Sequence, residues 1–271
     1  MAVIMEGRSL ARKIKNRVAE DVRRLGEDGI KVGLGLLLVG NNPASEQYLR
    51  ATLKACQETG VLSYEFRFNE DVSMNELLNA IYSINSDERI HGLLVFFPLP
   101  KKLNSRKLVN SIVPEKDVDG LGSVAIGKFA AEESTFQLYK EGFDPGLAKQ
   151  FGFLPCTPFG VLRLLEYYNI NVEGRHAVVI GKSLAVGKPL SLMLLAKDAT
   201  VTVCHKKTAN LKELTRQADI LCVAAGRPGL ITEDMVKEGV VVVDIGINVL
   251  PDGKVVGDVD FEAVSRKASY I

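Results

Sequence analysis

The feature that most constrains this chain is a regular alternation of short apolar runs with stretches of helical spacing. "VGLGLLLVG" (32–40) and "IHGLLVFF" (90–97) are continuous apolar runs of strand length, and two helical stretches and the alternating run "SYEFRF" (63–68) separate them. Farther along, "HAVVIG", "ATVTVC" and "DILCVAAG" are again strand-like runs with helical stretches between them. Such alternation favours mostly parallel sheets, so the sequence predicts an α/β fold.

The alternation falls into two units. The first has the order β-α-β-α-β, and the second is the more Rossmann-like. A chain of 271 residues is long enough for two small domains. We therefore expect an N-terminal α/β domain over residues 1–140 and a nucleotide-binding domain over residues 141–271. Residues 123–153 are less regular and rich in glycine, and we expect the chain to cross between the domains there.

Helix starts are predicted from side chains that can cap free backbone N–H groups. "SEQYLRATLKAC" begins a helix at Ser45, and this helix should stop at Gly60. Ser73 has an acidic residue three positions later, which makes a capping box. Thr157 precedes a proline at the first helical position, and Thr232 precedes "EDMVKEG". We expect a helix after each of them.

Composition argues against several classes of function. The chain has 34 basic and 33 acidic residues, so the basic excess that nucleic-acid binding usually needs is missing. No run approaches the roughly 18 apolar residues of a membrane span, and the start of the chain turns charged too early for an apolar signal segment. The three histidines do not pair at metal-ligand spacing, so no metal site is expected.

The four cysteines lie far apart and without C-x-x-C spacing: Cys56, Cys156, Cys204 and Cys222. Redox-active and zinc-binding cysteines usually come in close pairs. We therefore expect buried, reduced thiols, as is usual for a cytoplasmic protein.

"VVIGKSLAVGKP" (178–189) is the clearest candidate for a binding site. Gly181 follows a predicted strand and Gly187 opens a helix, so backbone N–H groups and the positive end of the helix dipole can meet a phosphate. Lys182 and Ser183 stand in the same turn and can also contact phosphate. The spacing is G-x-S-x-x-x-G instead of G-x-G-x-x-G, and a plain tight turn would give the same pattern.

The next strand distinguishes between the two nicotinamide cofactors. An NAD site usually has an acidic residue about 20 residues after the glycine turn, which binds the ribose 2′-hydroxyl. Here His205, Lys206 and Lys207 follow the strand, and a cationic cluster suits the 2′-phosphate of NADP. A solvated run of surface charges is the alternative. "DIGIN" (244–248) ends a later strand at the same edge of the sheet.

Eight stretches, in order from residue 41 to residue 261, are similar to the methylenetetrahydrofolate dehydrogenase/cyclohydrolase family of one-carbon metabolism. They are "NNPASEQYLRATLKACQETG", "VFFPLP", "PEKDVDG", "PCTPFGV", "VVIGKSLAVGKP", "GRPGLI", "DIGIN" and "GDVDF". The resemblance implies two α/β domains flanking a cleft, a homodimer, and NADP on the second domain. It also implies two reactions, which are hydride transfer from methylenetetrahydrofolate to NADP⁺ and hydrolysis of the methenyl product to formyltetrahydrofolate.

The resemblance also gives roles to single residues. Tyr48 matches the family tyrosine that lies against the folate, and Asp119 matches the aspartate that hydrogen-bonds the pterin ring. Asp119 also precedes a glycine, so a role as a turn former is the alternative. The residues that match the family's dinucleotide contacts are Gly181, Lys182, Ser183 and Ile247.

Two positions depart from the family pattern. A lysine normally stands four residues after the tyrosine, and here that residue is Thr52. The family motif "VQLPLP" normally supplies a glutamine, and here that residue is Phe96. Lys54 is a poor substitute for the lysine, because it lies about 120° around the helix from Tyr48. The family also continues with a glycine-proline loop and a return helix, which do not follow "KASYI" here.

These departures predict unequal effects on the two reactions. A threonine hydroxyl is a poor base near neutral pH, whereas general acid–base catalysis contributes about 10²–10⁴-fold. Hydride transfer depends mainly on positioning. We therefore expect NADP-dependent dehydrogenation with weak hydrolysis. We also expect Tyr48 and Asp119 to keep their family roles as catalytic-site residues. The alternatives are a silent nucleotide- or folate-binding relic, another NADP-linked dehydrogenase, and a Phe96 side chain that only fills the core.

Overall fold

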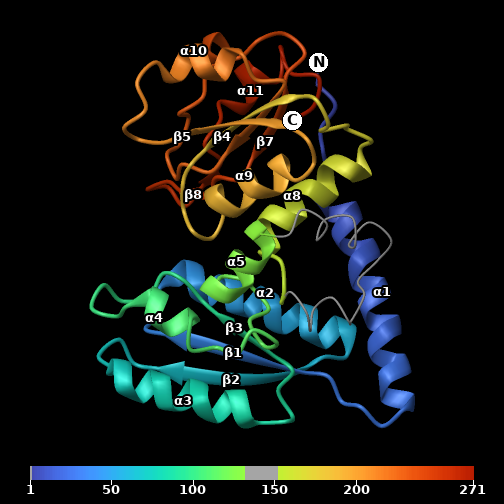
Figure 1. Cartoon of the computed structure of the whole chain (residues 1–271), viewed down its shortest axis with the longest axis vertical. Helices are drawn as coiled ribbons and strands as arrows, with labels where there is room; N and C mark the ends of the chain where they lie inside the picture. The colour runs from blue at the N-terminus through green and yellow to red at the C-terminus, as the bar shows by residue number, and fades with distance from the viewer. Residues whose placement is uncertain (1, 132–151) are drawn as a thin grey trace. The chain divides into compact units, whose positions relative to one another are not determined.

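The computed structural model describes residues 2–131 and 152–271, and it has the predicted α/β class (Figure 1). The chain divides into two compact units. We name the units for the ligands that the family resemblance implies: the folate-side unit is Arg8–Leu154, and the nucleotide unit combines Met1–Gly7 with Pro155–Ile271. The predicted boundary at residues 140 and 141 lies outside the described residues, as does most of the predicted crossing region. The described start of that region is helical, over Ser123–Ala131.

The folate-side unit is built on a three-stranded parallel sheet with the order β2-β1-β3. Its strands are β1 (Gly33–Val39), β2 (Leu62–Phe68) and β3 (Gly92–Val95). Its helices are α1 (Gly7–Glu27), α2 (Pro43–Thr59), α3 (Met74–Ser86), α4 (Ser105–Val109) and α5 (Ser123–Ala131).

Alternate residues of β1 pack on opposite faces of this sheet. Leu36 packs in a cluster with Leu49 of α2, and Leu37 packs in another cluster with Leu77 of α3. Figure 1 accordingly shows α2 and α3 on opposite sides of the strands. Both faces are covered, which explains why β1 is a continuous apolar run.

Helix α2 begins two residues earlier than the sequence predicted. Asn42 is its cap, because the Asn42 side chain accepts hydrogen bonds from the N–H groups of Ala44 and Ser45. Ser45 is instead buried inside the first turn, and its hydroxyl donates to the carbonyl of Phe97 at 2.9 Å. The predicted end is confirmed, because Gly60 has φ +79° and terminates the helix in the left-handed conformation.

The other predicted helix starts had mixed outcomes. The capping box at Ser73 is present at the start of α3. Thr157 is not a cap, because α8 (Cys156–Tyr167) already begins one residue before it. The helix expected after Thr232 is a single 3₁₀ turn, η1 (Glu233–Met235). Thr232 donates its hydroxyl to Asp234 and caps no backbone N–H there.

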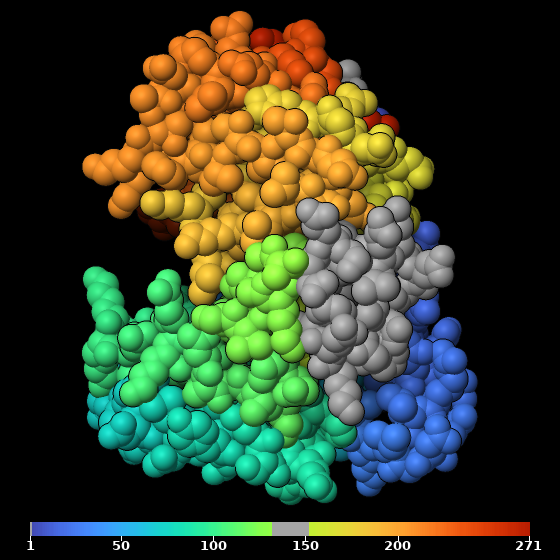
Figure 2. Space-filling model, viewed as in Figure 1, coloured from blue at the N-terminus to red at the C-terminus, as the bar shows by residue number. Residues whose placement is uncertain are grey.

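The nucleotide unit contains a four-stranded parallel sheet with the order β5-β4-β6-β7. Its strands are β4 (His176–Ile180), β5 (Thr200–Cys204), β6 (Ile220–Val223) and β7 (Val241–Asp244). Helices α8 and α9 (Gly187–Leu195) lie on one side of the sheet, whereas α10 (Leu211–Arg216) and α11 (Phe261–Val264) lie on the other (Figure 1). The segments that carry α8, α9 and α10, yellow to orange in Figure 2, form most of the unit's visible surface. Strand β5 lies on one side of β4 and strand β6 lies on the other, so the strand order reverses at this point. The carboxyl ends of β4 and β6 therefore form the switch point, where ligands of such sheets bind.

The two ends of the described chain extend this sheet beyond β7. Tyr270 forms parallel bridges with Val241 of β7 and with Val3 near the start of the chain. The backbone N–H of Val3 donates to Ser269, and the N–H of Ile271 donates to Val3. The last residues therefore lie between β7 and the first residues. A short antiparallel pair, β8 (Asn248–Val249) with β9 (Val255–Val256), follows β7.

The cysteine prediction is wrong at one position. Cys56, Cys204 and Cys222 are buried, but Cys156 at the start of α8 is exposed. Burial raises the pKa of the Cys222 thiol to about 12, so that this group stays protonated. Within residues 2–131 and 152–271, none of the helices combines the length and apolar character needed to cross a membrane.

Candidate active site

A pocket of about 430 Å³ opens at the carboxyl ends of three neighbouring strands of the nucleotide unit. The turns after β4, β5 and β6 all contribute to its walls. It is lined by Ile180, Gly181, Lys182, Ser183, His205, Lys206, Thr208, Leu211, Ala224, Ala225, Arg227 and Leu230. The structure thus brings four of the five predicted cofactor residues together at the switch point of the sheet.

The first wall is the glycine turn after β4, in which the neighbouring backbone leaves no room for a side chain at two glycine positions. Gly181 has φ +125°, and a Cβ atom there would lie 2.3 Å from the carbonyl oxygen of Ala224. A Cβ atom at Gly187 would lie 2.0 Å from the carbonyl oxygen of Gly181. The hydroxyl of Ser183 accepts the N–H groups of Val186 at 3.1 Å and Gly187 at 3.4 Å. The turn is therefore held in a compact shape directly before α9, where free helix N–H groups suit a phosphate.

The second wall is the turn after β5, and it carries part of the predicted cationic cluster. His205 and Lys206 line the pocket, but Lys207 does not. Nδ1 of His205 accepts the N–H of Lys207 at 3.1 Å, so the neutral ring carries its proton on Nε2. The N–H of His205 donates to the hydroxyl of Thr208 at 2.8 Å, which closes the turn.

The third wall is the turn after β6, and it adds a cation that was not predicted from the sequence. Arg227 lines the pocket together with His205 and Lys206. The available signal was its position in "GRPGLI", directly after a predicted strand of the same sheet. Three basic side chains around one pocket suit a group with two negative charges, such as the 2′-phosphate of NADP.

Ile247 is the predicted cofactor residue that the structure leaves outside this lining. It follows β7 in the same unit, and its side chain is 79% exposed. The segment around it is fixed by Asp244, which accepts the N–H groups of Gly246 and Val259, each at 3.0 Å. Ile247 is thus an exposed apolar side chain on an anchored turn at the carboxyl edge of the sheet.

In the folate-side unit, Tyr48, Thr52 and Phe96 lie close together. The ring of Tyr48 is 54% exposed and meets the ring of Phe96 edge to face, with centroids 5.2 Å apart and an interplanar angle of 73°. The hydroxyl of Thr52 donates to the backbone carbonyl of Tyr48 at 2.9 Å. This back-bond within the helix engages the only hydrogen that the Thr52 hydroxyl can donate.

Phe96 fills the core as well as contacting Tyr48. It is 0% exposed and belongs to the cluster on the α2 side of the sheet, whereas Phe97 packs with the cluster on the α3 side. The core-filling explanation for Phe96 is therefore correct as a description of its packing. Lys54 is exposed on α2, where its charge lowers the pKa of Glu58 together with a larger effect from a hydrogen bond to Lys15.

Asp119 lies in a turn that a neighbouring aspartate organises. Asp117 is almost completely buried and accepts the N–H of Gly122 at 2.7 Å. Burial raises the pKa of Asp117, and hydrogen bonds from the turn oppose that increase. Asp119 is half-buried two residues later. Asp117 therefore helps to shape this turn, two residues before the aspartate that was predicted from the sequence.

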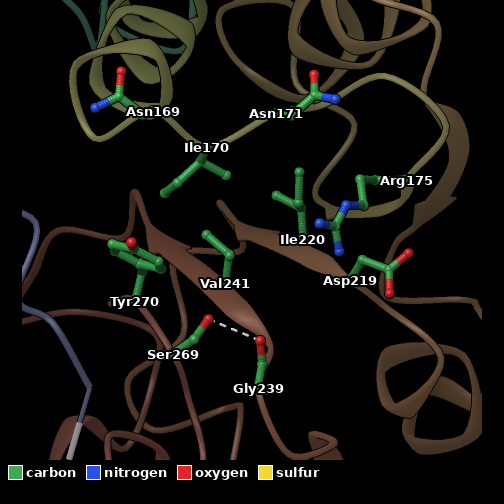
Figure 3. Close-up of a pocket in the computed structure, with 10 residues that line it drawn as sticks. All are labelled: Asn169, Ile170, Asn171, Arg175, Asp219, Ile220, Gly239, Val241, Ser269 and Tyr270. Carbon is green, nitrogen blue, oxygen red and sulfur yellow. Dashed lines mark hydrogen bonds between the residues drawn. The ribbon is translucent and has the colours of Figure 1, made fainter.

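A second cavity, of about 310 Å³, lies at the amino ends of β6 and β7 (Figure 3). Asn169 and Asn171 point away from its centre in Figure 3, and Ile170, Ile220 and Val241 surround it. Asp219 is engaged, because its carboxylate accepts the side chain of Lys237 at 2.6 Å and the N–H of His176 at 2.8 Å. The cavity lies at the edge of the sheet opposite the nucleotide pocket, and its lining is more polar than apolar.

The described residues contain no group of three or more His, Cys, Asp or Glu side chains that could hold a metal ion. The residues that line the pocket after β4, β5 and β6 suit a dinucleotide better than a metal ion. The glycine cradle leaves no room for a Cβ atom, a helix begins at the turn, and basic side chains gather in the adjoining walls. The residues present therefore suit a phosphorylated cofactor.

Comparison with known proteins agrees with this geometry. Residues 5–119 match the catalytic domain of tetrahydrofolate dehydrogenase/cyclohydrolase, and residues 155–271 match the NAD(P)-binding domain of the same family. The bifunctional protein FolD of Campylobacter jejuni is 46% identical over 268 residues, which cover 99% of this chain and 89% of that protein.

Solved structures show the same relationship. The crystal structure of FolD from Campylobacter jejuni matches with a TM-score of 0.91 at 45% identity, covering 100% of this chain and 90% of that one. The Trypanosoma brucei FolD, complexed with NADP cofactor and an inhibitor, matches with a TM-score of 0.88 at 30% identity, covering 100% and 89%. Fold, pocket and sequence agree, and the chain belongs to the tetrahydrofolate dehydrogenase/cyclohydrolase family.

Proposed function

We propose that this enzyme oxidises methylenetetrahydrofolate with NADP⁺ and hydrolyses the methenyl product only weakly. The observation that carries the proposal is the pair of substitutions beside Tyr48. The hydroxyl of Thr52 donates its hydrogen to the backbone carbonyl of Tyr48, and Phe96 is completely buried against the Tyr48 ring. The family pattern places a lysine and a glutamine at these two positions.

The dehydrogenase step depends on binding and alignment, and the nucleotide unit retains the groups for binding. Bound NADP⁺ supplies the hydride acceptor. The turn from Gly181 to Ser183 and the start of α9 hold phosphate through backbone N–H groups. Lys206 and Arg227 would supply positive charge for the 2′-phosphate, and the Nε2–H of His205 would donate a hydrogen bond to it. Because hydride transfer needs aligned reactants and no protein base, Thr52 and Phe96 leave this step possible.

The hydrolytic step needs an activated water and a group that accepts its proton. A lysine whose pKa is lowered by burial can exchange protons near neutral pH, but a threonine hydroxyl cannot. Phe96 adds an apolar ring where an amide would offer hydrogen bonds, so it does not orient a water molecule. We therefore expect the methenyl product to leave the enzyme largely unhydrolysed.

Tyr48 and Asp119 complete the proposal on the folate side. The exposed ring of Tyr48 offers an apolar face for the folate, and the carboxylate of Asp119 offers acceptors for the donor groups of a pterin. Assembly as a homodimer is part of the proposal, because the family resemblance implies it. Sedimentation velocity of the purified chain over a range of concentrations tests the dimer.

The deciding experiment is a paired assay on the purified full chain. Methylenetetrahydrofolate is supplied with NADP⁺ or with NAD⁺, and methenyl formation is followed by absorbance. Methenyltetrahydrofolate is supplied separately, and its loss is compared with the enzyme-free rate. We expect oxidation that prefers NADP⁺, together with hydrolysis close to the enzyme-free rate. Rapid hydrolysis would contradict the roles assigned to Thr52 and Phe96, and absence of both activities would favour a silent relic.

A further inference from the structure

One carboxylate in "GDVDF" holds the third wall of the nucleotide pocket in place. Asp258 is 0% exposed and accepts four hydrogen bonds. Its Oδ2 accepts the N–H of Ala225 at 2.6 Å and of Gly226 at 2.9 Å. Its Oδ1 accepts the N–H of Arg227 at 2.7 Å and the side-chain amide of Asn248 at 2.8 Å.

These bonds position the turn that consists of Ala225, Gly226 and Arg227. A buried carboxylate is costly unless donors surround it, and here four donors converge on one group. Ala225, Gly226 and Arg227 are exposed on their outer side, and Gly226 has φ +64°. Three consecutive N–H groups aimed at one anion form a concave turn, the shape of which depends on that anion. Asp258 therefore sets where this turn lies.

The carboxylate also joins this turn to the segment that follows β7. The Asn248 amide is directly after Ile247, and it reaches Asp258 from the "DIGIN" segment. A Cβ atom at Gly246 would lie 2.3 Å from the carboxyl carbon of Asp258 and 2.7 Å from its backbone nitrogen, so the two segments are in close contact there. The N–H of Asp258 in turn donates to Asp244 at 3.0 Å. A shift of Asp258 would thus move two turns at the cofactor edge of the sheet.

We propose that Asp258 is a positioning residue for NADP, which holds Arg227 beside His205 and Lys206 so that these side chains meet the 2′-phosphate together. The inference rests on the proposed function only in its choice of NADP as ligand. Asp258 acts through the turn and does not touch the cofactor, because its four acceptor interactions are all directed to the protein. Arg227 is the residue that carries its effect into the pocket.

The test compares two nucleotides that differ in the 2′-phosphate. Asp258→Asn keeps the size of the side chain but presents an NH₂ group to backbone N–H donors, so the turn must move. We expect the dissociation constant for NADP⁺ to rise about tenfold and that for NAD⁺ about twofold or less. The reason is that the charge-assisted contact between Arg227 and the 2′-phosphate is lost, and NAD⁺ has no 2′-phosphate. Asp260→Asn is the matched control, since Asp260 caps α11 and contributes no bond to the turn. Equal losses for the two nucleotides would indicate a merely structural role and overturn the proposal.

Two further variants keep the test decisive if Asp258→Asn does not fold. Arg227→Gln, with Asp258 intact, should reproduce the loss that is selective for NADP⁺. Asn248→Ala removes one of four donors and should give a smaller loss of the same kind, with faster hydrogen exchange at the Ala225 to Arg227 amides. Unchanged NADP⁺ affinity in Arg227→Gln would overturn the proposal, as would a wild-type chain that does not bind NADP⁺.

Nucleotide binding is measured without folate, by calorimetry on the full chain. A failure of the proposed function would appear as no methenyl formation by a chain that still binds NADP⁺ selectively. A failure of this inference would appear as unchanged selectivity for NADP⁺ over NAD⁺ in Asp258→Asn and Arg227→Gln while oxidation continues. The two failures therefore have different signatures.

Discussion

The ring of Phe96 meets the ring of Tyr48 edge to face at 5.2 Å, and this contact fixes one side of the exposed tyrosine. Phe96 is itself held by the core cluster on the α2 side of the sheet. The Tyr48 ring is therefore supported by a residue of the hydrophobic core. Such support is suited to holding a flat apolar surface and is poorly suited to moving protons.

Restoring the two family side chains should restore hydrolysis. In Thr52→Lys with Phe96→Gln, we expect hydrolysis of methenyltetrahydrofolate to increase about 10²-fold, because a base and a polar neighbour are supplied together. The loss of methenyl absorbance above the enzyme-free rate is the measurement. Ala51→Lys is the control, since it adds the same charge to α2 at an exposed position about 100° from residue 52. No increase in the double variant, or an equal increase in the control, would contradict the roles of Thr52 and Phe96.

Gly181→Ala should remove nucleotide binding. The added Cβ would lie 2.3 Å from the carbonyl of Ala224, and φ +125° is a strained conformation for alanine. We expect NADP⁺ affinity to decrease by about tenfold or more, which corresponds to about 1.4 kcal/mol or more of binding free energy. Calorimetric titration with NADP⁺ checks this. Gly160→Ala in α8 meets no atom within 4 Å and should bind NADP⁺ normally. Normal binding by Gly181→Ala would show that the turn does not hold the cofactor.

Asp117 should make the stability of the folate-side unit depend on pH. Its pKa is raised above the ordinary 3.8 by burial, so the folded state holds this proton more tightly than the unfolded state does. The stabilisation is fully present below pH 3.8 and is lost as pH increases through the raised pKa. Asp117→Asn should remove this contribution while its amide oxygen still accepts the N–H of Gly122. Urea unfolding at a series of pH values from about 4 upward checks this, and a slope that Asp117→Asn leaves unchanged would refute it.

The four cysteines should differ sharply in reactivity. Cys156 is exposed, whereas Cys56, Cys204 and Cys222 are buried and have pKa values that burial raises. Because the thiolate is the reactive form, iodoacetamide should label Cys156 first in the native protein. Peptide mass spectrometry locates the label, and the urea-unfolded chain, in which all four should react, is the control. Early labelling of Cys222 in the native state would contradict its burial within β6.

The sequence predicted the elements whose signals are local. Continuous apolar runs and the alternating run at residues 63–68 identified strands of the two parallel sheets. The capping box at Ser73 identified the start of α3, and the glycine turn identified one wall of the nucleotide pocket. Asn42 was missed as a cap because Ser45, three residues later, has equally suitable chemistry and only the buried bond to Phe97 distinguishes them. The stretch after Thr232 has helical composition, yet tertiary contacts leave it a single turn.

The residues that escaped prediction depend on distant parts of the chain. Arg227 reaches the pocket because its turn is bound by Asp258, and these two residues are 31 positions apart. Neither the basic side chain nor the carboxylate has a local pattern that reveals the other. Ile247 shows the reverse case, since its motif matches the family contact but its side chain lies outside the pocket lining.

The bridge between Val3 and Tyr270 has a consequence for synthesis on the ribosome. Val3 is translated before the folate-side unit, but Tyr270, with which it pairs, is translated after that unit. All of the folate-side unit is made in the interval, and it can reach its native state while the first residues are still without their partner. The nucleotide unit, in contrast, can join Val3 to its sheet only after Tyr270 has been made, when the whole folate-side unit has already been translated.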